Sequence, residues 1–346
     1  MKIAIIGAGV SAAAACKALT AQGASVTVFE KARGPGGRIS SKRALAGSFD
    51  FGAQYFTARS EAFLAQVQQW QAQGLVQRWD FVPYQYQQGR LSPSPDDEIR
   101  YIGTSTMHQM LSGEFEGATL YTGCKINELS YICSNVSSQS SGQWQLCSEQ
   151  GECFGGFDAL LLTCPPEQAF QLLEGAPLSL QIPKRALLPC WAVLLELANP
   201  THQQAQGIFV QDGNTRWIAQ QSAKPGRQSA RLQQETVQAP APEQWLVHLS
   251  EDCSARELET MPEQISALAA AELSRVLGTQ VQVAAALCHR WLYASYNSDI
   301  PPCGVLFDKK MQLALCGDWT LGGRVENAWL SGVEAASKLL GRAHNT

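Results

Sequence analysis

The sequence predicts an α/β fold in which a Rossmann-type domain is joined to a second, β-sheet-based domain. The chain opens on a strand–helix–strand pattern, with an apolar run at 2–6, an alanine-rich helical stretch at 10–22 and a second strand at 25–30. A strand, a glycine-rich turn and a helix return at 313–340. Between about 186 and 250 the pattern changes to short, separated β-like runs. We therefore expect the two ends of the chain to form one domain and the middle to form another.

Periodicity and turn residues predict the remaining elements. Helical spacing marks residues 60–73, a shorter stretch near 104–112 and residues 262–277. Further strands are expected at 117–123, 125–132, 143–148 and 158–163. The last of these is fully apolar, as in a buried parallel strand, and Pro165 and Pro166 stop it before another helix. The Ser-rich stretch 134–142 is expected to be a surface loop and 224–244 a Gln- and Pro-rich connection.

Composition excludes several classes of function. The formal net charge is −4 and no run of Lys and Arg occurs, which argues against a nucleic-acid partner. No stretch is long and apolar enough to span a membrane, and Gly7 and Gly9 interrupt the opening run that could pass for a signal peptide. The eleven cysteines are an odd number without a C-x-x-C pair, so we expect small buried thiols in a reducing, cytoplasmic compartment. The five histidines show no metal-ligand spacing.

The first glycine-rich turn matches a dinucleotide-binding fingerprint. Residues 7–12 read G-A-G-V-S-A, so Gly7, Gly9, Ser11 and Ala12 fit the pattern G-x-G-x-x-A between a strand and a helix. Such glycines allow a tight turn, and the helix N-terminus attracts a pyrophosphate. Glu30 ends the second strand at the distance expected for accepting from ribose hydroxyls, and Lys31 follows it. An acid at this position disfavours a ribose 2′-phosphate.

Two further turns favour a cofactor longer than NAD. Gly36 and Gly37, with Arg38, can bring backbone N–H groups and a guanidinium to a second part of the same ligand. Near the C-terminus a carboxylate is available for ribityl hydroxyls and a helix N-terminus for the anionic side of a reduced flavin. The residues at that third turn are Gly317, Asp318, Arg324, Val325 and Glu326. Three such sites in one chain predict one non-covalent FAD.

The sequence resembles FAD-dependent amine-oxidase-like flavoproteins, and most closely their renalase-like branch. The resemblance is carried by "GAGVSA" with Glu30, "GPGGR", "DFGAQYFTA" at 50–58, "KPGR" at 224–227, "WLVH" at 245–248, "HRWLYA" at 289–294 and "CGDWTLGGRVENAWLSG" at 316–332. It implies an amine-oxidase/p-hydroxybenzoate-hydroxylase-like architecture in which a β-sheet domain covers the flavin face. The implied division is an FAD-binding domain of residues 1–58, 100–165 and 285–346 and a substrate domain of residues 59–99 and 166–284.

The resemblance also implies roles for single residues. Glu30 would bind the adenosine ribose, Arg38 the phosphates and Asp318 the pyrophosphate–ribityl region. Gln54 and Tyr55 would lie beside the isoalloxazine, and His248 and Trp291 would line the substrate side. These last four residues are the catalytic candidates. Each of the last two has an equal alternative. His248 could instead be a hydrogen-bonded histidine of the core, and Trp291 could instead be an aromatic residue that only packs.

The implied activity is transfer of a hydride from a small donor to flavin N5, with oxygen or a quinone as the acceptor. The renalase resemblance implies that the donor is a dihydro isomer of NAD(P)H, which is oxidised to NAD(P)+. Two alternatives stay open, an amine oxidase of small amines and a flavin-binding redox sensor without turnover. The sequence does not identify the acceptor or the oligomeric state.

Overall fold

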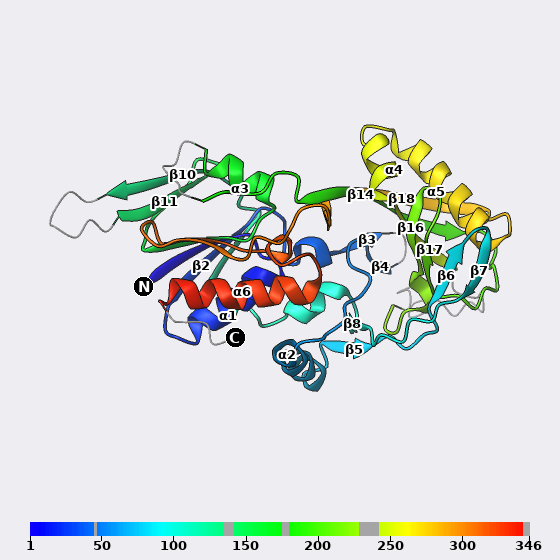
Figure 1. Ribbon diagram of the computed structural model, residues 1–346, viewed down its shortest axis with the longest axis horizontal. Helices are drawn as coiled ribbons and strands as arrows, with labels where there is room; N and C mark the ends of the chain where they lie inside the picture. The colour runs from blue at the N-terminus through cyan, green and yellow to red at the C-terminus, as the bar shows by residue number, and fades with distance from the viewer. Residues whose placement is uncertain (45–46, 134–141, 175–179, 228–241, 342–346) are drawn as a thin grey trace.

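The computed structural model describes residues 1–44, 47–133, 142–174, 180–227 and 242–341 (Figure 1). Almost all of the predicted loop at 134–142 and most of the predicted connection at 224–244 lie outside these ranges. Two bodies of secondary structure lie side by side along the long axis of the molecule, and the predicted α/β fold with a second sheet domain is confirmed (Figure 1). No helix of the described residues is long and apolar enough to cross a bilayer.

The first body is built on a six-stranded sheet in the order β19-β20-β13-β1-β2-β9. Its strands are β1 (Lys2–Ile6), β2 (Ser25–Glu30), β9 (Thr119–Thr122), β13 (Ala159–Leu162), β20 (Leu313–Leu315) and β19 (Leu306–Asp308). All neighbours pair in parallel except the edge pair β19–β20. The apolar runs at 3–6 and 159–162 are buried because layers cover both faces of the sheet.

Helices from the two ends of the chain pack together on this sheet. Helix α1 (Val10–Thr20) follows β1, and helix α6 (Val325–Leu339) lies beside it, as Figure 1 shows. Their alanines and apolar residues join the strands in one core cluster, which also includes helix α2 (Glu61–Ala72) through Phe63 and Trp70. The prediction that both chain ends form one domain is therefore confirmed.

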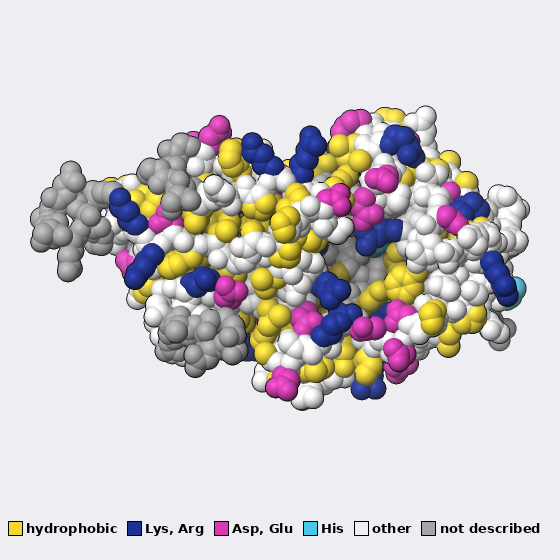
Figure 2. All heavy atoms as spheres, viewed as in Figure 1, with side chains coloured by type: hydrophobic (Ala, Val, Ile, Leu, Met, Phe, Trp, Pro, Cys, Tyr) yellow, Lys and Arg dark blue, Asp and Glu magenta, His cyan; other side chains and the backbone are white. Residues whose placement is uncertain are grey.

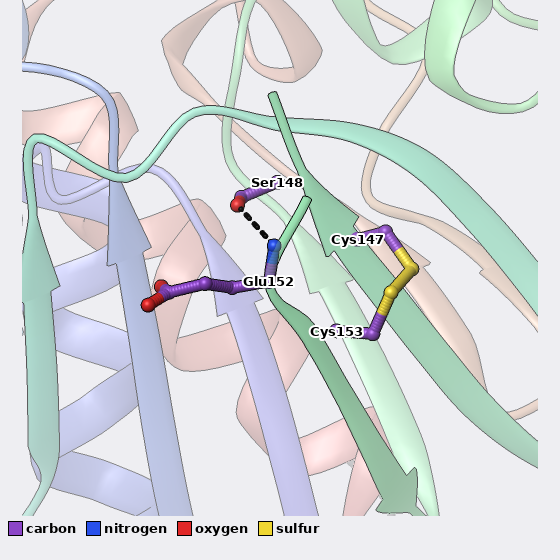
Figure 3. The surroundings of a disulfide bond; sticks show 4 residues. All are labelled: Cys147, Ser148, Glu152 and Cys153. Carbon is purple, nitrogen blue, oxygen red and sulfur yellow. Dashed lines mark hydrogen bonds between the residues drawn. A yellow bond between two sulfur atoms is a disulfide. The ribbon is translucent and has the colours of Figure 1, made fainter. Parts of the chain in front are cut away.

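A three-stranded antiparallel sheet covers the other face of the first sheet. It contains β10 (Ile126–Cys133), β11 (Gly142–Ser148) and β12 (Cys153–Phe157), and its core cluster includes helix α3 (Pro166–Leu172). Cys147 and Cys153 are register partners across β11 and β12, and they form a disulfide (Figure 3). The expectation that all cysteines are free thiols is wrong for this pair, because the hairpin between Cys147 and Cys153 closes their six-residue separation. The cytoplasmic location, which leaned on free thiols, stays a prediction.

The second body is a seven-stranded sheet in the order β18-β14-β17-β16-β15-β6-β7. Its strands are β6 (Tyr84–Gln87), β7 (Arg90–Pro93), β14 (Leu187–Leu197), β15 (Gly207–Val210), β16 (Thr215–Gln220), β17 (Gln244–Leu249) and β18 (Val283–Tyr296). Helices α4 (Glu251–Arg256) and α5 (Pro262–Leu277) lie on its outer face (Figure 1). The apolar stripe of α5, with Ile265 and Leu273, packs against Val193 and Val247, and the helix predicted at 262–277 is confirmed.

The expected domain boundaries need two corrections. Strand β18 belongs to the second sheet through its long pairing with β14, although the boundary at 285 assigned most of it to the FAD-binding domain. Helix α3 belongs to the first body, because Ala169 and Leu173 pack with Ile6 and Leu160, although the boundary at 166 assigned it to the substrate domain. Neither correction could be made from local periodicity, since both depend on which core buries the apolar face.

Short elements connect the two bodies. The hairpin β3 (Ser41–Ala44) and β4 (Gly47–Asp50) lies between the two large sheets in Figure 1. A second small pair is formed by β5 (Val76–Arg78) and β8 (Tyr101–Gly103). The helical stretch predicted near 104–112 is a 3₁₀ helix at Met107–Leu111. Figure 2 shows a hollow between the two bodies, with charged side chains of both signs around its rim.

Candidate functional site

The first glycine-rich turn places an open helix N-terminus at the carboxyl edge of the first sheet. Gly7 has φ +101°, and a Cβ there would lie 2.5 Å from Thr163 Oγ1, so only glycine fits between β1 and β13. No side chain caps helix α1, whose N-cap is Gly9. Ser11 and Ala12 lie buried in its first turn. The result is the local geometry of a phosphate-binding helix end.

Glu30 holds this turn in place while keeping acceptor capacity. One carboxylate oxygen accepts from the Ala8 N–H at 2.8 Å and the other from the Ala32 N–H at 2.7 Å. Each oxygen of an ionised carboxylate has a further lone pair, so Glu30 can still accept from a ribose hydroxyl. Lys31, by contrast, is exposed, and its Nζ lies 3.4 Å from Gln168 Oε1.

The second and third glycine-rich turns meet the first one. The Gly36 N–H donates to the Ala8 carbonyl at 2.9 Å. Arg38 forms a bidentate ion pair with Asp318, one arm of which measures 3.0 Å from Nη1 to Oδ2. Arg38 Nη1 also lies 3.3 Å from the Ala294 carbonyl of β18. The three turns that the sequence singled out therefore converge on one region, and the second domain reaches it as well.

Glu326, at the start of α6, has a different environment from the one expected. It is 5 % exposed, and its carboxylate accepts from the Arg59 N–H at 3.2 Å and from the Ser60 N–H and hydroxyl at 2.7 Å each. Ser60 is the N-cap of α2, so the hydrogen bonds of Glu326 connect the start of α6 to the start of α2. Arg324 precedes it in a left-handed conformation with φ +78°, and Val325 begins α6, which no side chain caps.

These observations fit an extended dinucleotide. Two uncapped helix starts, those of α1 and α6, offer backbone N–H groups to anions, and Gly9 leaves open space where a Cβ would stand. Glu30 offers acceptors for ribose, and Arg38 and Asp318 form a polar pair between the ends of the chain. In the described part of the chain no cluster of His, Cys, Asp and Glu could hold a metal ion.

Gln54 belongs to a buried polar network and not to a free surface. Its Nε2 donates to the Asp50 carbonyl at 2.5 Å and the Gly52 carbonyl at 2.9 Å, and its Oε1 accepts from Lys224 Nζ at 2.9 Å and from Gln221 Nε2. All four hydrogen-bonding positions of the amide are thereby filled. In this structure Gln54 organises the loop at 50–55, and its amide has no hydrogen bond left for a ligand.

Three fully buried ions lie in the same network. The side chains of Asp50, Lys224 and Arg227 are each 0 % exposed, with Asp50 Oδ2 3.4 Å from Lys224 Nζ and 2.8 Å from Arg227 Nη2. The Ser41 hydroxyl at 2.5 Å and the Met107 N–H at 2.9 Å donate to Asp50 Oδ1. We call these three residues the buried ion cluster. It joins β4 of the connecting hairpin to the turn after β16 of the second body.

Burial and charge act in opposite directions on this cluster. Burial alone would raise the pKa of Asp50, but Lys224 and Arg227, with two hydrogen bonds, hold it below its usual value. Burial lowers the pKa of Lys224 to about 8, against the attraction of Asp50. At neutral pH the cluster holds two cations and one anion, so it carries one net positive charge.

Tyr55 lies in a group of aromatic rings. Its ring centroid is 5.3 Å from that of Trp217 and 6.5 Å from that of Trp79, and the Arg100 guanidinium lies 5.1 Å from it. Burial raises the pKa of the Tyr55 hydroxyl. Within the described ranges the buried indole N–H groups of Trp79 and Trp217 have no hydrogen-bond partner. Unpaired buried donors of this kind are rare and mark a place for a bound acceptor or a water molecule.

His248 and Trp291 meet at one backbone carbonyl. His248 Nε2 and Trp291 Nε1 each lie 3.0 Å from the Phe51 oxygen. Because a carbonyl only accepts, His248 Nε2 carries a proton, and burial lowers the pKa of this histidine to about 4. A Cβ on Gly52 would lie 1.8 Å from the Arg38 carbonyl, so only glycine lets this loop pass so close. The loop of Phe51 thus joins both residues to the Arg38 region.

The register of the second sheet places these rings on its inner face. Phe209 pairs with Trp217, Trp217 with His248, and His248 and His289 both pair with Ala192. Directly paired residues share a face of a sheet. We call the row from Phe209 to His289, together with Trp291, the ring wall. It turns toward the hairpin β3–β4 and the first body, as the contacts of Phe51 with His248 and Trp291 show.

Sequence reasoning missed several residues of this region. Lys42 Nζ lies 2.7 Å from His289 Nδ1, and no motif marked Lys42. The available signals were "HRWLYA", which begins with His289, and "KPGR", which begins with Lys224 and ends with Arg227. Asp50 stands first in "DFGAQYFTA" and could have been singled out as a carboxylate in an apolar context.

Comparison with known proteins agrees with this geometry. A family model described as an NAD(P)-binding Rossmann-like domain matches residues 5–69. A protein of Exiguobacterium sp. 255-15 assigned as a protoporphyrinogen oxidase superposes with TM-score 0.74 at 12% identity, covering 99% of both chains. Cyclohexylamine oxidase from Brevibacterium oxydans IH-35A gives TM-score 0.69 at 13% identity over 98% of both chains. Putrescine oxidase bound to putrescine gives TM-score 0.67 at 11% identity over 99% of this chain and 100% of that one.

These structures match almost the full length of the chain, so the likeness includes both bodies and their arrangement. At these identities it is a likeness of fold. The chain therefore carries a Rossmann-like dinucleotide-binding domain within the two-domain fold of these oxidases.

Proposed function

We propose that the protein is an FAD-dependent oxidoreductase that takes a hydride from a small donor. The three converging turns would hold the cofactor, with Glu30 at the adenosine ribose, the start of α1 at the pyrophosphate and Arg38–Asp318 at the pyrophosphate–ribityl region. When bound, FAD supplies the hydride acceptor at N5. The chain's own residues bind and orient the donor and exclude water.

The ring wall is the observation that carries the choice of reaction. A hydride passes without a separate acid or base when the donor holds its reacting carbon against the acceptor in a fixed geometry. On this wall His248 is neutral and its Nε2 proton is held by the Phe51 carbonyl. The wall therefore offers flat rings for stacking a planar substrate, and Trp291 of the wall is bonded to the loop at 50–55, which also carries the ring of Tyr55.

The charges favour an anionic, planar donor over a cationic one. The buried ion cluster carries one net positive charge, and Lys42 adds another beside His289. A small ammonium substrate would approach two like charges, whereas a nucleotide would be attracted. The unpartnered N–H groups of Trp79 and Trp217 suit an acceptor such as a carboxamide oxygen. We therefore propose dihydro isomers of NAD(P)H as donors, oxidised to NAD(P)+ in a cytoplasmic setting.

An amine oxidase of small amines is the second candidate. Aromatic rings such as Tyr55 and Trp217 can attract a cation by their π faces, and two of the solved structures compared above are amine oxidases. The difference between the two donors lies in proton transfer. An ammonium must lose a proton before its C–H bond is oxidised, and a dihydronicotinamide need not.

Anaerobic mixing tests the proposal. FAD-loaded protein is mixed with 2- and 6-dihydro isomers of NAD(P), with ordinary NAD(P)H and with primary and secondary amines, and loss of flavin colour is followed. We expect rapid bleaching by the isomers alone. Rapid bleaching by an amine without response to the isomers would establish the second candidate instead. Bleaching without turnover when oxygen or a quinone is added would identify a redox sensor.

A further inference from the structure

Lys42 and His289 form a contact between the connecting hairpin and the second body at the edge of the ring wall. Lys42 lies on β3 and His289 on β18, and the Lys42 Nζ to His289 Nδ1 distance is 2.7 Å. The Lys42 ammonium also lies 5.6 Å from the centroid of the Phe51 ring. An ammonium group has three N–H donors, and the contact with His289 uses one of them. Two donors of Lys42 thus stay available.

The charge of Lys42 has no carboxylate to balance it. Lys42 forms no ion pair with any Asp or Glu of the described ranges, whereas Arg38 on the preceding stretch is paired with Asp318. His289 does not offset it either, because burial and the nearby Lys42 lower the pKa of this histidine to about 4 and keep it neutral. Lys42 itself is partly buried. A partly desolvated, unbalanced ammonium is a place where an anion binds favourably.

The contact also fixes the tautomer of His289. Since the ammonium donates to Nδ1, the ring proton must sit on Nε2, which then donates away from Lys42. The imidazole is held by its T-shaped contact with Trp291, at 4.4 Å between ring centroids. The imidazole N–H therefore points away from the ammonium, and the two remaining N–H groups of Lys42 are the donors available beside His289 and Trp291.

We propose that Lys42, held in place by His289, forms an anion subsite that binds a phosphate oxygen of a nucleotide donor while the ring wall holds its nicotinamide. The inference rests on the proposed function, and it adds that the protein recognises the substrate by its phosphate end. Phosphate oxygens accept charge-assisted hydrogen bonds from Lys, and a dinucleotide has a pyrophosphate a short distance from its nicotinamide. A small neutral or cationic substrate would leave the subsite unused.

Binding of ADP-ribose to the FAD-loaded protein tests the subsite without turnover. ADP-ribose has the pyrophosphate and lacks the nicotinamide, and adenosine serves as the ligand without phosphate. The variants are Lys42→Gln, Lys42→Arg and the matched control Arg43→Gln. Arg43 is exposed and follows Lys42 on the same strand, so its side chain points to the opposite face. Thermal stability and FAD content are measured for each variant.

We expect Lys42→Gln to weaken ADP-ribose binding by about tenfold or more, as loss of a charge-assisted hydrogen bond does. Its affinity should also depend less on salt, whereas adenosine binding should not change. Lys42→Arg should retain most of the affinity, and Arg43→Gln should bind like the parent protein. Equal losses in Lys42→Gln and Arg43→Gln would show only a diffuse charge effect and overturn the proposal. Absence of ADP-ribose binding to the parent protein would overturn it too.

The subsite and the proposed function can fail separately. If Lys42→Gln loses ADP-ribose binding but no dihydro isomer bleaches the flavin, the subsite stands and the proposed donor is wrong. If the isomers bleach the flavin of Lys42→Gln with an unchanged KM, the donor stands and the subsite is wrong. If Lys42→Gln has a raised KM for the isomers but an unchanged limiting rate of flavin bleaching, both the subsite and the proposed donor are supported.

Discussion

Neutralising Asp50 should destabilise the protein more than any exposed carboxylate does. Asp50 is the single anion of the buried ion cluster, and its carboxylate accepts from Lys224, Arg227, Ser41 and Met107. Asp50→Asn keeps the volume of the side chain, but Lys224 and Arg227, whose side chains are 0 % exposed, lose their counter-charge. Breaking a buried pair by removing one partner costs about 3–5 kcal/mol, because an uncompensated charge stays buried.

Urea unfolding at pH 7 with and without added FAD measures this effect. The control is Glu98→Gln, which removes an exposed pair with Arg59 whose side chains are 44% and 42% exposed, and which should change the free energy of unfolding by less than about 1 kcal/mol. The deficit of Asp50→Asn should shrink as the pH rises toward about 8, the pKa of Lys224 in the parent protein, and should level off above it, because Lys224 without Asp50 loses its proton at a lower pH and is neutral in both proteins above that value. A loss no larger than that of Glu98→Gln would show that the cluster is not held by charge, and the reasoning would fail.

Three further variants address the cofactor and the ring wall. Glu30→Gln should weaken FAD binding by about 1.5–3 kcal/mol, since ribose loses a charged acceptor; unchanged affinity in an FAD titration would contradict this role. The pKa of His248 lies at about 4 in the folded chain against 6.5 for a histidine exposed to water, so the unfolded chain binds the extra proton between these values. Because His289 also has a pKa of about 4, each of these two histidines should lower the stability by at most about 1.4 kcal/mol per unit as the pH drops from 6.5 to 4, and His248→Gln should remove only its own share of that slope in thermal melts. Trp291→Phe keeps a ring but loses the bond to the Phe51 carbonyl, and it should slow anaerobic bleaching while FAD stays bound; an unchanged rate would make Trp291 a packing residue only.

The sequence alone determined the elements that depend on local pattern. The strand–helix–strand start, the apolar strand at 159–162 and the helix at 262–277 follow from periodicity and turn residues, which act over a few positions. The turn at Gly7 and the acid at Glu30 were found for the same reason, because a dinucleotide-binding turn has a fixed local spacing. The convergence of three glycine-rich turns was also predicted, since strand order in an α/β sheet brings such turns to one edge.

Tertiary structure decided the contacts between segments that are far apart in the chain. Lys224 meets Asp50 across 174 positions and Lys42 meets His289 across 247, so no local pattern marks either pair. The pairing of β18 with β14 depends in the same way on strand register. The disulfide of Cys147 with Cys153 spans only six positions, but it too depends on the register of β11 and β12. Glu326 was predicted as a cofactor residue from its place beside a helix start, and this stays a prediction; only the packing of α2 decided that its carboxylate accepts from Ser60. Local propensity sets which strands and helices form, whereas the packing of their buried faces sets which charged and aromatic side chains come together. The candidate site is made of side chains that this packing brings together.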